Sequence, residues 1–135
     1  MDRTQLHRLL PHQGPALWLE RLLEHDAERI RGLSDWSHLQ AFGAEASPCY
    51  LFEAAAQLCA AHGALYGGDQ PIKLASIGKL SQLTLHQPAP ERRGELALEA
   101  SQVAQGPGGA LYDFRIHAGD QLLLDGKLLL VLVHA

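Results

Sequence analysis

The 135 residues are enough for one domain with a sizeable core, since 47% are hydrophobic and only 19% are charged. This composition excludes a disordered chain, and the formal net charge of −4 gives no reason to expect a nucleic-acid partner. Cys49 and Cys59 form neither a CxxC pair nor a disulfide framework, which predicts a reducing, cytoplasmic location. No signal peptide and no apolar run long enough for a bilayer are found, so we expect no membrane association.

Hydrophobic periodicity predicts the elements in chain order, and glycine or proline punctuates them. In the first half we expect a short helix over 4–10, strands over 17–24 and 28–34, and a long helix over 51–67 that ends near Gly67-Gly68. The stretch between the second strand and the long helix is expected to be irregular. In the second half we expect strands over 72–86, 95–104, 111–117 and 121–133.

The last of these strands is so apolar that it should lie inside the sheet, although Asp125-Gly126 could mark either a hairpin or a bulge. Strand, strand, long helix and four further strands together predict one α+β domain spanning 1–135. The simplest fold that buries an apolar helix of this kind is an antiparallel sheet of about six strands wrapped around that single helix.

Two polar residues interrupt the long helix, LFEAAAQLCAAHGALYG. At 100° per residue, Glu53, Gln57, Ala60 and Ala64 share one stripe. The stripe could be a solvated face, but it carries no lysine or arginine and its neighbours are small. A face built for close contact is the alternative, and a covered, unpaired Glu53 would then be a candidate acid or base.

Four segments, taken in order, carry a family resemblance: LLPHQGPALWLERLLE (9–24), LFEAAAQ (51–57), KLASIGKLSQLTLHQPAPERRGELALEA (73–100) and IHAGDQLLLDGKLLLVL (116–132). They resemble the hotdog-fold dehydratases that act on 3-hydroxyacyl groups of acyl carrier protein. The chain is most similar to the divergent branch of predicted dehydratases of aryl-polyene-type pathways. The resemblance covers nearly the whole chain.

The resemblance implies a hotdog fold and a dimer whose active sites lie between subunits, with a histidine of one chain facing the helix carboxylate of the other. It implies Glu53 as the catalytic carboxylate, Gln57 as the residue that orients it, and no metal or redox cofactor. The substrate would be a 3-hydroxyacyl thioester of acyl carrier protein or CoA, and the product a 2-enoyl thioester. A homodimer is expected, with a higher oligomer or a heterodimer as alternatives.

The chain departs from the family pattern ahead of the helix. Typical members carry G-H-F-P-G-x-P, whose histidine is the base, where this chain has SHLQAFGAEASP (37–48). The family glycine whose N–H helps hold the thioester oxygen aligns with Pro48, which has no N–H, or with Cys49 after a one-residue gap. His12, which matches the family's opening Pro-His, and His38 are therefore both candidates for the base. The other six histidines show no metal-ligand spacing and are expected to be ordinary.

Three functions remain open from the sequence. A dehydratase requires a histidine within proton-transfer reach of Glu53 across the dimer. A hotdog thioesterase requires the carboxylate, a water molecule and an oxyanion hole. A non-catalytic acyl-binding subunit would bury Glu53 by packing and leave no tunnel to it. The scaffold hosts several thioester chemistries, so the fold alone does not choose among them.

Overall fold

The structure, a computed structural model, describes residues 1–67, 72–87 and 90–134. Its elements in chain order are α1 (Arg3–Leu9), η1 (Gly14–Ala16), β1 (Arg21–His25), β2 (Arg29–Asp35), α2 (Ser37–Gln40), η2 (Pro48–Leu51), α3 (Phe52–Tyr66), β3 (Ile72–Leu85), β4 (Glu95–Gly106), β5 (Gly109–Ala118) and β6 (Gln121–His134). Gly67 caps α3, and Gly68 lies outside the described residues.

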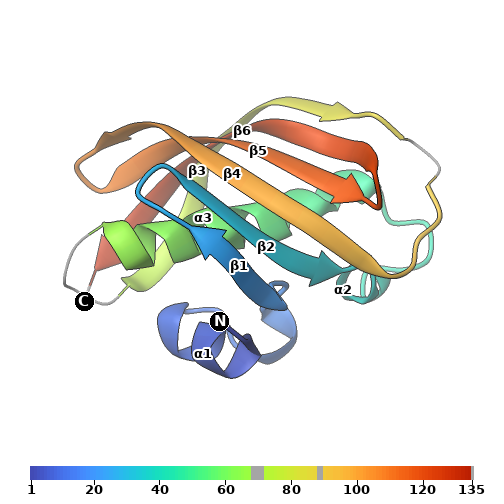
Figure 1. The fold of residues 1–135 in the computed structure, drawn as a ribbon, viewed down its shortest axis with the longest axis horizontal. Coiled ribbons are helices and arrows are strands. Elements are labelled where there is room, and N and C mark those ends of the chain that lie inside the picture. The colour runs from blue at the N-terminus through green and yellow to red at the C-terminus, as the bar shows by residue number, and fades with distance from the viewer. Residues whose placement is uncertain (68–71, 88–89, 135) are drawn as a thin grey trace.

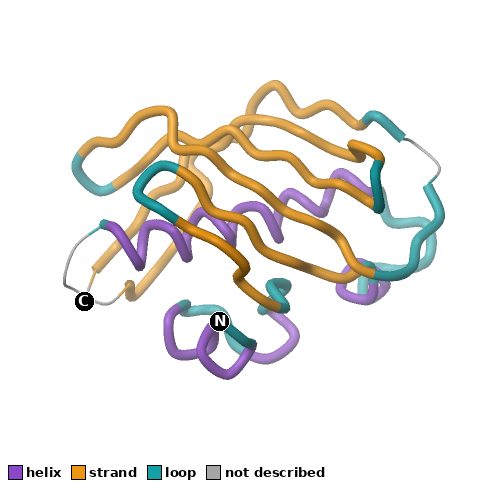
Figure 2. The backbone as a smooth tube through the Cα atoms, in the orientation of Figure 1, coloured by secondary structure: helices purple, strands orange, loops and turns teal. Residues whose placement is uncertain are grey.

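The six strands form one antiparallel sheet in the order β1-β2-β4-β5-β6-β3. The sheet curves around α3, which runs along its inner face, while α1 lies below the β1 edge (Figures 1 and 2). This is the predicted architecture, so the α+β hotdog fold is confirmed. The apolar last strand, β6, pairs on both sides and lies inside the sheet, as expected.

The core forms where α3 meets the inner face of the sheet. Every residue from Ala54 to Gly63 is buried, including Leu58, whose burial contributes about 1.5–3 kcal/mol. Gly63 lets the helix approach β6 closely, because a Cβ there would come 2.5 Å from the Cδ1 of Leu132. The helix is therefore held against the sheet by close packing as well as by the burial of apolar surface.

The stripe that carries the two polar helix residues is covered. Ala56, Gln57, Ala60 and Ala61 are all buried, and Glu53 and Ala64 near the two ends of the helix are partly exposed. The solvated-face interpretation is therefore wrong, and the face is built for contact.

Three local predictions are corrected by the structure. The first strand was expected to begin at Leu17, but β1 begins at Arg21, because side chains rather than a neighbouring strand bind the main chain of 16–19. The irregular stretch after β2 contains the single helical turn α2.

The third correction concerns Asp125-Gly126. β6 runs straight through both residues, so the hairpin interpretation is wrong. The register shift lies on the neighbouring strand, between Ser81 and Thr84 of β3, where Gln82 has a φ of +53°.

Candidate functional site

Gln57 joins the central helix to the segment that enters β1. Its side chain is fully buried; Oε1 accepts from the Trp18 N–H at 2.6 Å, and Nε2 donates to the Ala16 carbonyl at 2.7 Å. The same Nε2 lies 3.4 Å from Oε1 of Glu53. One amide therefore satisfies two main-chain groups some 40 residues away and touches the carboxylate.

The segment held by Gln57 brings His12 to Glu53. Nε2 of His12 lies 4.0 Å from Oε1 of Glu53, and the two side chains are 19% and 39% exposed. The ring enters from the turn between α1 and η1, whereas the carboxylate comes from the first turn of α3. A carboxylate and an imidazole thus face one another within a single chain, at a separation that a hydroxyl group or a water molecule can bridge.

Burial lowers the pKa of His12 below 6.5, although the negative charge of Glu53 acts in the opposite direction. Nδ1 of His12 is buried and is the one such side-chain atom that has no hydrogen-bond partner among the described residues. Without a partner, Nδ1 adds no hydrogen bond that would stabilise the imidazolium form, and the effect of burial outweighs the attraction of Glu53. His12 is therefore neutral near pH 7, and Nε2 is its accessible nitrogen.

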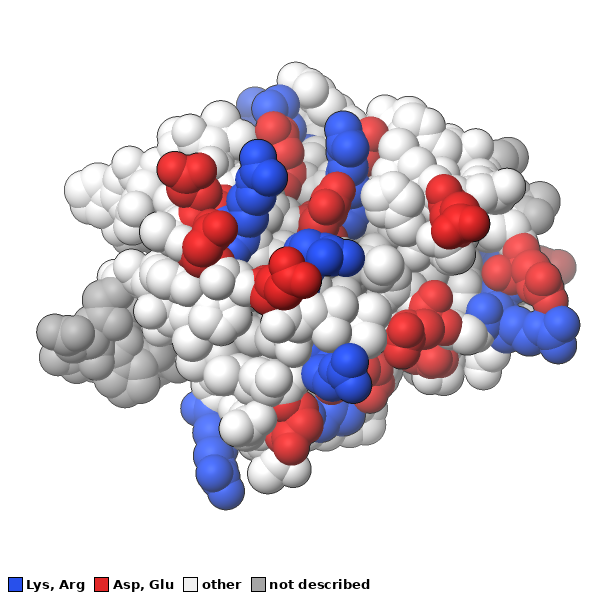
Figure 3. Space-filling view, in the orientation of Figure 1, with Lys and Arg blue, Asp and Glu red and all other residues white. Residues whose placement is uncertain are grey.

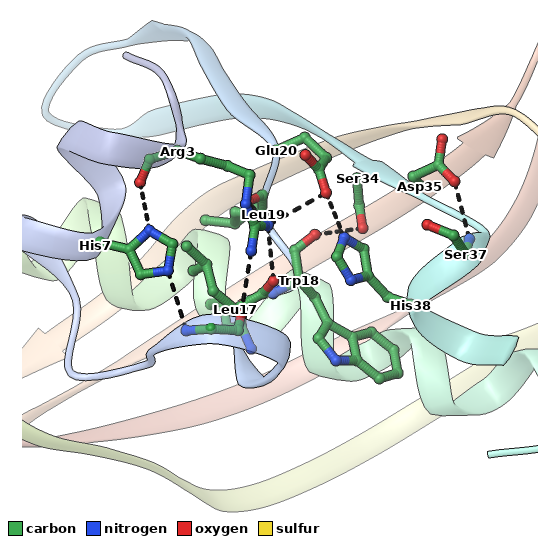
Figure 4. Close-up of polar contacts among 12 residues, drawn as sticks. Arg3, His7, Leu17, Trp18, Leu19, Glu20, Ser34, Asp35, Ser37 and His38 are labelled. Carbon is green, nitrogen blue, oxygen red and sulfur yellow. Dashed lines mark hydrogen bonds and ion pairs between the residues drawn. The ribbon is translucent and has the colours of Figure 1, made fainter. Parts of the chain in front are cut away.

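His38 is directed elsewhere. It donates from Nε2 to Oε1 of Glu20, and its ring stacks on Trp18 with centroids 6.1 Å apart and planes 18° apart (Figure 4). Glu20 also accepts from Arg3 at 3.2 Å. Of the two candidate bases, the structure brings His12 to the helix carboxylate and pairs His38 with Glu20.

The amide groups ahead of α3 are already engaged. Pro48 opens η2 without an N–H, and the Cys49 N–H donates to Oγ of Ser47 at 3.2 Å. The Tyr50 N–H bonds to the Ser47 carbonyl at 3.1 Å. A thioester oxygen at this position would have to displace the weak Ser47 contact to reach the Cys49 N–H.

An aromatic patch borders this end of the helix. Phe42 and Tyr50 are 64% and 52% exposed and stack with centroids 6.1 Å apart, and Phe42 also packs against Trp18 at 5.8 Å. These exposed aromatic rings form an apolar surface beside the start of α3.

Two surface clefts among the described residues lie away from His12 and Glu53. The larger, about 780 Å³, is a shallow groove on the outer face of the sheet, where the row Arg31, Glu99, Arg115 and Asp125 crosses four neighbouring strands with alternating charge (Figure 3). Because neighbouring charges neutralise one another, the groove has no field of one sign to attract a charged partner.

The described residues contain no group of three or more potential metal ligands and no helix long and apolar enough to cross a bilayer. Cys49 and Cys59 are both free thiols, and burial raises the pKa of the Cys59 thiol, which makes it unreactive.

Sequence reasoning missed Arg3, Glu20 and Ser47. Glu20 orients the His38 ring by a hydrogen bond, and the Oγ of Ser47 accepts the hydrogen bond of the Cys49 N–H. Nothing in the spacing marks the first two, because their contacts join residues that are 17 and 18 positions apart in sequence and belong to different parts of the fold. Ser47 could have been found as the N-cap that commonly precedes a helix.

Comparisons with known proteins give the family and the fold of the chain. A model of the ApeP-like dehydratase family matches residues 4–133. No curated protein sequence gives a match. Among solved structures, the dehydratase heterocomplex ApeI:P from Xenorhabdus doucetiae superposes with a TM-score of 0.84 at 16% identity, covering 96% of this chain and 91% of that chain.

Two thioesterase structures are also similar. A mutant thioesterase from Pseudomonas aeruginosa gives a TM-score of 0.73 at 16% identity, covering 100% of this chain and 96% of the other. A hypothetical thioesterase with coenzyme A from Streptococcus pneumoniae gives 0.64 at 15%, covering 97% and 96%. At these identities the structural likeness shows the hotdog fold, while the family model spans nearly the whole chain. The chain belongs to the ApeP-like dehydratase family.

Proposed function

We propose that this protein removes water from a 3-hydroxyacyl thioester, carried on acyl carrier protein or CoA, to give the 2-enoyl thioester. The observation that carries the proposal is the His12–Glu53 pair, in which a neutral imidazole and a carboxyl group lie 4.0 Å apart. The dehydratase family match supports the reaction class. Dehydration needs a base and an acid at one site, and these two residue types fill both roles near neutral pH.

In the proposed mechanism His12 is the base and Glu53 is the acid. Nε2 of His12 takes the proton from the carbon next to the thioester carbonyl, while Glu53, which must carry a proton in the productive state, gives that proton to the departing hydroxyl, which leaves as water. The resulting imidazolium and carboxylate attract each other by about 1–4 kcal/mol at 4 Å, between the limits for bulk water and a protein surface. Return of the proton from His12 to Glu53 resets the site.

Gln57 orients the acid, and His38 has a supporting role. The Gln57 amide donates to the carboxylate and is itself fixed by two short main-chain bonds, so Glu53 has a fixed neighbour on one side. His38 and Glu20 brace the main chain around Trp18 rather than the reacting atoms. The Cys49 N–H is the donor offered to the thioester oxygen once that oxygen displaces Ser47.

A protein partner completes the acyl site in this proposal. β3 is a sheet edge of 14 residues, with Leu74 exposed on it and Ile77 and Leu80 only partly buried. A long apolar edge of this kind is normally covered. The solved neighbour is described as a dehydratase heterocomplex, which supports a protein partner, and the exposed β3 edge is where we place a second subunit, identical or different.

The test is an assay with a 3-hydroxyacyl thioester that follows the 2-enoyl product and the free thiol together, with the purified chain alone and with a partner hotdog subunit. Glu53→Gln and His12→Ala should each lower the rate of enoyl formation by about 10²–10⁴-fold, whereas His38→Ala should keep most of the rate. Free thiol without enoyl product would assign a thioesterase. Neither product over several chain lengths would assign a non-catalytic acyl-binding subunit.

A further inference from the structure

The turn that carries His12 is held by α1, through His7. Nδ1 of His7 lies 2.8 Å from the Arg3 carbonyl, and its Nε2 accepts from the Gly14 N–H at 3.1 Å. Because a carbonyl can only accept, Nδ1 carries the proton and Nε2 is the acceptor. Gly14 has a φ of +55°, a left-handed conformation that glycine adopts without strain. His7 thus fixes a tight turn two residues after His12.

Arg3 holds the same segment from its other side. Its guanidinium donates to the carbonyls of Gly14 at 3.2 Å, Leu17 at 2.9 Å and Leu19 at 3.1 Å, and to Glu20 at 3.2 Å. Figure 4 shows Arg3 and His7 turned from α1 toward the segment that carries Leu17 and Trp18. Four acceptors on one guanidinium make this a rigid clamp, since the planar fork loses little entropy per bond.

His12 itself makes no hydrogen bond with the described residues that would fix its ring. Nδ1 is unpartnered, and Nε2 is 4.0 Å from Glu53, beyond hydrogen-bond distance. The position of the ring therefore depends on the turn, and the turn depends on His7 and Arg3. Gln13, next to His12, adds a bond from Nε2 to the His7 carbonyl at 2.9 Å.

We propose that His7 and Arg3 are positioning residues, whose hydrogen bonds to Gly14 hold Nε2 of His12 within proton-transfer reach of Glu53. This inference rests on the proposed function for its effect on rate, but the placement of His12 can be measured without any activity. A purely structural role for α1 would lower stability and leave both the kcat of the folded protein and the His12 ring unchanged.

The test compares His7→Ala with His7→Gln and with Arg8→Ala, in the full chain. Arg8 is a matched control, because it lies next to His7 on α1, is exposed and makes no hydrogen bond recorded among the described residues. Gln at position 7 restores a neutral acceptor for the Gly14 N–H. His7→Ala should lower kcat about 10–100-fold and leave KM within about twofold, since small misplacements of a catalytic group cost this much. His7→Gln should recover kcat to within about threefold of the wild type, and Arg8→Ala should leave it unchanged.

The second readout is an NMR titration of the His12 ring in the same variants. Loss of the turn exposes His12, so its pKa should rise toward 6.5 in His7→Ala, and stay at the wild-type value in His7→Gln and Arg8→Ala. An unchanged His12 titration in folded His7→Ala would overturn the positioning role. If the wild type shows no dehydration, the proposed function fails and the titration still decides this inference.

Discussion

The substitution of Gln57 by alanine tests the arrangement of the site through stability. Gln57 is fully buried, and its removal leaves the buried Trp18 N–H without a partner, while the carbonyl of Ala16, an exposed residue, can bind water instead. An unpaired buried group costs about 1–3 kcal/mol, so we expect Gln57→Ala to lose about 2–4 kcal/mol, including a small cavity term. That is a large share of a typical stability of about 5–15 kcal/mol.

The assay is urea unfolding at one fixed protein concentration, read as a shift of the midpoint at constant slope. Gln40→Ala is the control, because Gln40 is exposed on α2, and it should change the free energy of unfolding by less than about 0.5 kcal/mol. A loss of less than about 1 kcal/mol for Gln57→Ala would refute the bridging role assigned to this amide.

Three further outcomes are expected. Ser47→Ala frees the Cys49 N–H and should raise kcat for dehydration by about two- to tenfold, which corresponds to the net free energy of one hydrogen bond. An unchanged or lower kcat would show that this amide does not hold the thioester oxygen. Burial lowers the pKa of His12 and His62, so below pH 6.5 the unfolded chain binds more protons than the folded chain. The contribution of these two histidines to stability is therefore complete above pH 6.5 and is lost as the pH falls below it. Urea midpoints at pH 8, 6.5 and 5 should show a smaller loss in His62→Gln than in the wild type, and an equal loss would contradict this. Leu74→Lys at the β3 edge should weaken association in sedimentation velocity, and an unaltered oligomer would remove this edge from the interface.

The fold could be predicted from the sequence because its signals are local. The strands of the second half are separated by turns with Gly108 and Gly119 in left-handed conformations, and the apolar helix contains the polar pair four residues apart. The contact between Glu53 and Gln57 follows from helical geometry alone, and the structure contains it at 3.4 Å.

The choice between His12 and His38 could not be predicted, because it depends on the path of irregular chain. The segment around Trp18 is positioned by Gln57, 39 residues away in sequence, and the His38 side chain pairs with the Glu20 carboxylate, 18 residues away in sequence. The same segment explains why the first strand begins later than expected. Periodicity carries no information on contacts of this kind, since they depend on the folded core.

The central claim is that His12 and Glu53 of one chain form the acid–base pair, and one measurement addresses it most directly. Equal amounts of His12→Ala and Glu53→Gln chains are co-expressed, and the oligomer is assayed for 2-enoyl product beside the wild type. A pair within one chain predicts no recovery, because no chain in the mixture carries both groups. Recovery to about one quarter of the wild-type rate, the statistical yield of a mixed dimer with one restored site, would place the pair across subunits and contradict the account.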